Sequence, residues 1–113
     1  MADLLSRHAR GETLSAPERV YAGRGALALL ARRAPGRSVE VRVPYVGAVQ
    51  IIAGPTHTRG TPPTVVEMTA EAWLNLATGR LSWEDALAAG TVAASGVRAD
   101  LSPLLPITEG HHD

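Results

Sequence analysis

Valine alternates with charged residues at positions 39–43, where the sequence reads Val-Glu-Val-Arg-Val. Side chains on a strand point to opposite faces in turn, so this period of two predicts a strand with one buried and one solvated face. A strand of this kind must bury its apolar face against a second layer. The rest of the chain therefore has to supply neighbouring strands and a cover of helices.

Three further segments are expected to be strands. Residues 48–52 and 64–68 are apolar runs, separated by a Gly-, Pro- and Thr-rich loop over 54–63. The turn residues Pro44-Tyr45-Val46-Gly47 join the first strand to the second. We expect these three strands to pair as an antiparallel meander. A fourth strand over residues 91–95 returns to the sheet after two helices.

The helices carry clear start and stop signals. A helix over residues 15–34 begins at Ser15-Ala16-Pro17-Glu18 and ends before Pro35-Gly36. Gly23 lies on its apolar stripe, where it permits close backbone approach. Thr69 and Ser82 are expected to cap two shorter helices that end at Gly79 and Gly90. An apolar helical turn follows at 101–105.

This order predicts an α+β fold: an antiparallel sheet of about four to five strands covered on one face by short helices. We expect one domain over residues 15–107. Residues 1–14 are small and polar without a clear period, which predicts a flexible arm. The polar residues 108–113 are expected to be a flexible tail.

Composition excludes several classes of protein. The chain has 113 residues without cysteine, so disulfides and thiolate metal sites are ruled out. Its net charge is zero, which argues against nucleic acid as a partner. No secretory signal and no membrane-spanning stretch are visible, so we expect a cytoplasmic protein. Aromatic residues make up only 4%, with no Phe, which makes the two Trp prominent.

The second half of the chain carries an ordered set of features. Residues 71–81 form a short helix that ends in Gly and a basic residue. Residues 83–96 add a helix with an inward Ala and Leu that ends in Gly, then a strand that ends in Gly. Paired leucines close the set at 101–105. This arrangement resembles the sterol carrier protein family, and looks most like a bacterial, actinobacterial-type branch in which the loop 57–63 precedes the third strand.

The resemblance implies a hydrophobic tunnel between the sheet and its covering helices. It implies non-enzymatic binding or transport of an apolar, lipid-like molecule of fatty acyl or sterol type, without cofactor, metal or catalytic residue. Apolar side chains on strands and helices are expected to line the tunnel: Val49, Ile51, Val66, Met68, Trp73, Leu76, Trp83, Leu87, Leu101, Leu104 and Leu105. Trp73 and Trp83 are open to a second interpretation as core residues, and the three C-terminal leucines either form a lid or close the core.

The loop over 57–63 contains several polar and charged side chains that could bind a charged group. His57, Thr58, Arg59 and Thr61 are candidates for binding a carboxylate or phosphate head group. The alternatives are a structural connection, or a surface that docks a protein partner while the core is filled. A small enzyme that uses His57 and Arg59 is a further alternative.

The histidines and arginines bear on two other kinds of site. The four histidines do not share metal-ligand spacing: His8, His57, His111 and His112. The basic helix over 15–34 is compatible with transient contact with an anionic membrane surface, but packing against the sheet with its arginines in solvent is the favoured interpretation. A continuous cavity, rather than a filled core, is the observation that separates a carrier from a docking module.

Overall fold

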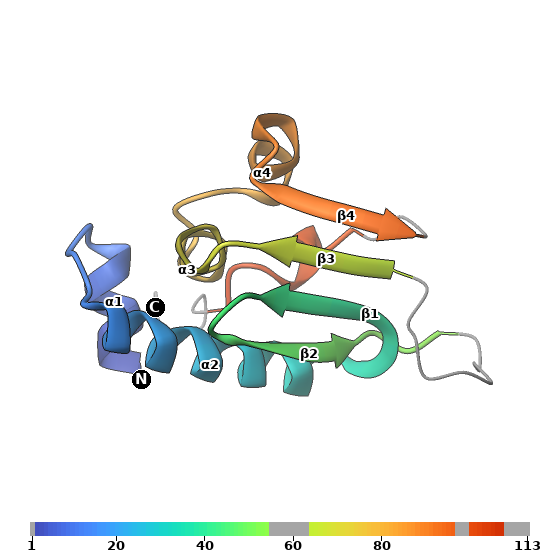
Figure 1. Cartoon of the computed structure of the whole chain (residues 1–113), viewed down its shortest axis with the longest axis horizontal. Coiled ribbons are helices and arrows are strands. Elements are labelled where there is room, and N and C mark those ends of the chain that lie inside the picture. The colour runs from blue at the N-terminus through green and yellow to red at the C-terminus, as the bar shows by residue number, and fades with distance from the viewer. Residues whose placement is uncertain (1, 55–63, 97–99, 108–113) are drawn as a thin grey trace.

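The computed structural model of the chain describes residues 2–54, 64–96 and 100–107. The helices are α1 (Ala2–Ala9), α2 (Ala16–Arg33), α3 (Ala70–Thr78) and α4 (Trp83–Ala89), with a 3-10 turn η1 (Ser102–Leu104). The strands are β1 (Pro35–Val43), β2 (Gly47–Ile51), β3 (Thr64–Met68) and β4 (Val92–Gly96). Figure 1 shows one sheet, with α2 running alongside β2 and α4 beside the start of β4. The expected α+β fold is confirmed.

The sheet is mixed rather than antiparallel throughout. Its strand order is β2-β1-β3-β4. β1 pairs antiparallel with β2 but parallel with β3, and β3 pairs antiparallel with β4. The expected meander is therefore wrong at one step, because β3 joins the far edge of β1 instead of β2. The long connection after β2 gives the chain room to return, and α2 packs along β2.

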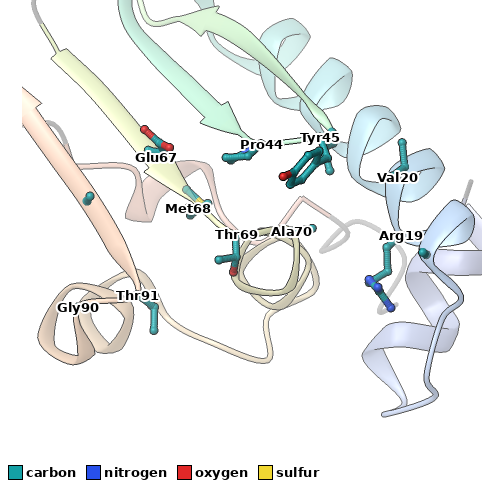
Figure 2. Close-up of a pocket in the computed structure, with 13 residues that line it drawn as sticks. Arg19, Val20, Pro44, Tyr45, Glu67, Met68, Thr69, Ala70, Gly90 and Thr91 are labelled. Carbon is teal, nitrogen blue, oxygen red and sulfur yellow. The ribbon is translucent and has the colours of Figure 1, made fainter.

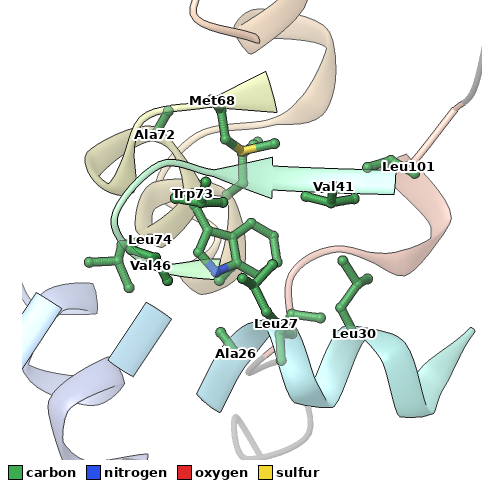
Figure 3. Packing of buried hydrophobic residues seen from close by; sticks show 14 of the residues in the cluster. Ala26, Leu27, Leu30, Val41, Val46, Met68, Ala72, Trp73, Leu74 and Leu101 are labelled. Carbon is green, nitrogen blue, oxygen red and sulfur yellow. The ribbon is translucent and has the colours of Figure 1, made fainter. Parts of the chain in front are cut away.

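One face of the sheet is buried and the other is open, as the alternating valines predict. Val39, Val41 and Val43 are buried, whereas Arg42 between them is exposed. The neighbouring strands add Ile51, Val66 and Met68 to the same hydrophobic cluster. Figure 3 shows side chains of α2 and α3 packed with this layer. The burial of this apolar surface supplies the main driving force for folding.

The predicted helix signals are present in the structure. Ser15 caps α2 in a capping box: its hydroxyl accepts from the Glu18 N–H, while its own N–H donates to the Glu18 carboxylate at 2.8 Å. Hydrogen bonding to Ser15, chiefly through its backbone N–H, and the nearby Arg7 lower the pKa of Glu18 below its ordinary value. Gly79 and Gly90 end α3 and α4 in the left-handed conformation.

The first residues differ from the expected flexible arm. Residues 2–9 form α1, which packs against α2 and α3, and Leu5 is only 2% exposed. His8 is buried and its Nε2 atom lies 2.8 Å from the Asn75 side-chain oxygen. Eight residues span little more than two helical turns, which is too short for a hydrophobic period to stand out in the sequence.

The C-terminal segment is fastened to the end of α2. The Arg33 guanidinium donates to the carbonyl oxygens of Leu104 and Pro106 at 2.9 and 3.0 Å, and to that of Ile107 at 3.2 Å. The Ile107 N–H in turn donates to the Ala77 carbonyl at 2.8 Å. These bonds hold the paired leucines against the covering helices.

Candidate functional site

A pocket of about 600 Å³ lies at the end of the sheet, where α2, the β1–β2 turn, the start of α3 and the α4–β4 junction meet. Figure 2 shows its labelled residues around a common hollow. Most of its wall is apolar: Ala16, Val20, Pro44, Tyr45, Val46, Met68, Ala70 and Ala93. The polar part of the wall consists of Arg19, Glu67, Thr69 and Thr91, with Gly90 between them.

Tyr45 is held over this pocket by an unusual turn. The Val46 N–H donates to the Val43 carbonyl at 2.9 Å, with Pro44 at the second and Tyr45 at the third position of the turn. Tyr45 has φ 69°, a conformation that favours glycine at this position of a type II turn. Its side chain is nevertheless large and 95% exposed. The turn thus presents an exposed ring beside the pocket at the cost of a strained backbone.

The turn is attached to α2 at one point. Val46 is buried, and the Arg24 Nε atom donates to its carbonyl oxygen at 2.7 Å. A Cβ atom added to Gly23 would lie 2.9 Å from Val46 Cγ1. The glycine on the apolar stripe therefore permits a close approach, which is made by the Val46 side chain rather than by another backbone segment. This contact fixes the position of Tyr45 relative to α2.

The arginines around the pocket differ in whether a carboxylate pairs with them. Arg19 donates from Nη1 to the Leu14 carbonyl at 2.8 Å, and no carboxylate pairs with it among the described residues. Glu67 lies opposite Arg42 in the parallel register of β1 and β3. A hydrogen bond to Glu40, together with the charges of Glu40 and Glu67, raises the pKa of Arg42 above its ordinary value.

A second, more open hollow of about 470 Å³ adjoins the pocket. The two share Pro44, Tyr45, Val46 and Glu67, and the second adds Arg24 and Arg42. The charged side chains of the combined wall are thus three arginines and one glutamate. Glu40 pairs with Arg42 at 3.0 Å, so Arg19 and Arg24 are the cations of this wall without a carboxylate partner among the described residues.

The residues expected to line a tunnel have three different locations in the structure. Ile51, Val66, Trp73, Leu76 and Leu101 are among the most completely buried side chains of the core. The Trp73 indole N–H donates to the Gly23 carbonyl at 3.0 Å, so this ring joins α3 to α2. Only Met68 of the expected set lines the large pocket.

Some members of that set contact a different, smaller cavity, although Leu76 and Trp83 among them are buried core residues. Leu76, Trp83 and Leu105 contact a smaller cavity of about 200 Å³ beside α3 and α4. Val49 and Leu104 pack against the core while partly exposed, and Leu87 is 37% exposed. The structure therefore does not bring the expected residues together around one cavity. The expected head-group or docking residues lie outside the described part of the chain: His57, Thr58, Arg59 and Thr61.

Sequence reasoning missed the residues of the large pocket apart from Met68. The signal that was present is Tyr45, which follows Pro44 at a turn position where glycine is usual. Over residues 2–54, 64–96 and 100–107, no cluster of three or more His, Asp or Glu side chains has the arrangement of a metal site. Within the same ranges, no helix is sufficiently long and apolar to cross a membrane.

A one-sided α+β sheet with its helical cover is compatible with a sterol-carrier-like domain. A family model described as bacterial SCP ortholog matches residues 16–107, and the chain belongs to this family. The family is of sterol carrier type, a class whose members are in general non-enzymatic carriers. The resemblance seen in the sequence is thereby confirmed. No curated protein matches the chain.

Proposed function

We propose that this chain binds one lipid-like apolar molecule without catalysing a reaction, and that the molecule occupies the pocket beneath Tyr45. The single observation that carries the proposal is the pocket itself. Its volume of about 600 Å³ lies within the range of roughly 300–1,000 Å³ that is typical of small-molecule sites. Its wall is mainly apolar, with a few polar groups at the margins, which is the usual composition of such sites.

This position differs from a tunnel through the core. The side chains between the sheet and its covering helices, Trp73 and Leu76 among them, are fully buried and in contact with one another. A ligand there would have to displace packed groups, whereas the pocket needs no such rearrangement. Transfer of an acyl or sterol surface into the pocket would stabilise the complex through removal of apolar area from water.

Filling the pocket should abolish much of this binding. Ala16 is an exposed residue at the first position of α2 and lines the pocket, so Ala16→Trp would place an indole in the ligand's space. We expect the affinity for a fluorescent fatty acid to fall about tenfold or more, which corresponds to about 1.4 kcal/mol of lost binding energy. Titration of the purified variant with the probe, followed by displacement with unlabelled fatty acid, measures the change.

The matched control is Ala28→Trp, an exposed position on the same helix outside the pocket. It should leave the affinity unchanged. Equal affinity of the wild type and Ala16→Trp would contradict the proposed position. Native mass spectrometry and lipid extraction of freshly purified wild-type protein address the function itself. Absence of any lipid, together with no probe binding, would contradict lipid binding.

Tyr45→Gly is expected to make the protein more stable and a poorer binder. Glycine removes the penalty of a side chain in the left-handed conformation, about 1–2 kcal/mol, and part of this gain is lost to its greater freedom when unfolded. We expect the free energy of unfolding to rise by about 0.5–1 kcal/mol in denaturant titration. The affinity for the fatty acid probe should fall, because the apolar ring over the pocket is gone.

Tyr21→Ala provides the comparison for this experiment. Tyr21 is also an exposed tyrosine, at 61%, but it lies on α2 outside the pocket. Its replacement should not change probe affinity. A Tyr45→Gly protein that is less stable than the wild type, or binds the probe equally well, would show that the strained turn has no role in the site.

A further inference from the structure

One end of the pocket carries a cation that the protein itself does not neutralise. Figure 2 shows Arg19 projecting from α2, across the hollow from Glu67 on β3. Its Nη1 atom is occupied by the Leu14 carbonyl at 2.8 Å, which fixes the guanidinium in place. A guanidinium has five N–H donors, so Nε and Nη2 remain for a further acceptor. Among the described residues no carboxylate uses them.

The only acid of the described pocket wall, Glu67, lies across the hollow from Arg19 and next to Arg42 in the sheet. Glu67 faces Arg42 across the β1–β3 pair, and its charge contributes to the raised pKa of Arg42. Arg24 extends the positive charge into the adjoining hollow, where Arg42 is paired with Glu40 at 3.0 Å. The pocket therefore combines an apolar wall with an excess of positive charge at its margin.

We infer that the pocket selects single-chain amphiphiles whose head group is an anionic oxygen acid, and that Arg19 binds this head group. The apolar chain would lie along Val20, Tyr45, Met68 and Ala70. Carboxylate and phosphate share this chemistry, and both form charge-assisted hydrogen bonds with a guanidinium. The inference depends on the proposed function and adds to it the class of ligand and the residue that selects it.

The test compares ligands that have the same tail and different heads. Dodecanoate, dodecyl phosphate, 1-dodecanol and dodecylammonium are each used to displace the fluorescent fatty acid from the full chain. For the wild type we expect both anions to bind roughly tenfold more tightly than the alcohol, since hydrogen bonds to charged groups exceed neutral ones and partial exposure limits the gain. The advantage should decrease as salt is raised, because salt screens an exposed charge.

Arg19→Gln should reduce the ratio of dodecanoate to dodecanol affinity to near one, and Arg19→Lys should retain part of it. The ratio is the useful quantity, because any general damage from loss of the Leu14 contact affects both ligands alike. Arg32→Gln is the matched control: Arg32 is exposed on the same helix and lies outside all three hollows. Thermal unfolding of each variant checks that it is folded.

Each outcome has a distinct meaning. Anion preference that disappears in Arg19→Gln and persists in Arg32→Gln supports the inference, and the two anionic probes then show whether carboxylate or phosphate is preferred. Equal binding of the alcohol and the anions, or a preference for dodecylammonium, overturns the head-group role of Arg19 while the proposed lipid binding stands. Failure of all four probes to bind overturns the proposed function as well.

Discussion

Replacement of Trp73 by alanine is expected to lower the free energy of unfolding by about 3–5 kcal/mol, the usual cost of removing a buried large aromatic side chain. Trp73 is fully buried at the centre of the core, and its indole N–H bonds to the Gly23 carbonyl at 3.0 Å. Its loss would leave a large void between α2 and α3 and remove the indole hydrogen bond to α2. Because small domains have only about 5–15 kcal/mol of stability, the variant should be partly unfolded at moderate temperature.

Trp73→Phe separates packing from hydrogen bonding. The phenyl ring retains much of the buried volume but cannot donate to Gly23, so we expect a smaller loss of about 1–3 kcal/mol. Urea unfolding followed by circular dichroism measures both variants. A loss below about 1 kcal/mol for Trp73→Ala would mean that this part of the core is loosely packed, and would restore the idea of a tunnel between the sheet and its helices.

Gly36→Ala is expected to lower the free energy of unfolding by about 3 kcal/mol or more. Gly36 has φ 154°, a conformation almost restricted to glycine. A Cβ atom there would lie 2.0 Å from the carbonyl carbon of Ile52. This backbone cannot move easily, because the Ile52 N–H donates to Ala34 at 2.7 Å and its carbonyl accepts from the Ser38 N–H at 3.1 Å.

Gly90→Ala is the matched control for this prediction. Gly90 also has a positive φ, of 74°, but no atom lies within 4 Å of the position of an added Cβ. Only the conformational penalty of about 1–2 kcal/mol applies there. Equal losses in the two variants, measured by urea unfolding, would show that the close approach of Gly36 to Ile52 is relieved at little cost.

Local structure was largely predictable from the sequence, whereas strand order was not. The alternation of valine and charge indicated β1. Helix starts were marked by Ser15, Thr69 and Ser82, because each side chain accepts the backbone N–H three residues ahead. These signals are local. The parallel pairing of β1 with β3 depends on contacts between distant segments, and a period of two specifies which face is buried without specifying the neighbour.

The site was harder to predict for a physical reason. An apolar residue on a strand or helix is equally suited to a filled core and to the wall of a cavity, and sub-ångström packing decides between them. Most of the tunnel residues expected from the family resemblance turned out to be core residues, as Trp73 illustrates. The pocket depends instead on where a turn places Tyr45, which follows from a backbone conformation that hydrophobic periodicity does not report.

The short helix α1 has a consequence for anyone who wishes to trim this protein. It lies outside the region that the family model matches, yet it inserts Leu5 into the common core and bonds through His8 to Asn75. Cutting the chain back to residues 16–107 would remove α1 and expose the apolar surface of α2 and α3 that it covers. Poor solubility of such a fragment would then result from the loss of α1, and would not mean that the fold of the family is unstable.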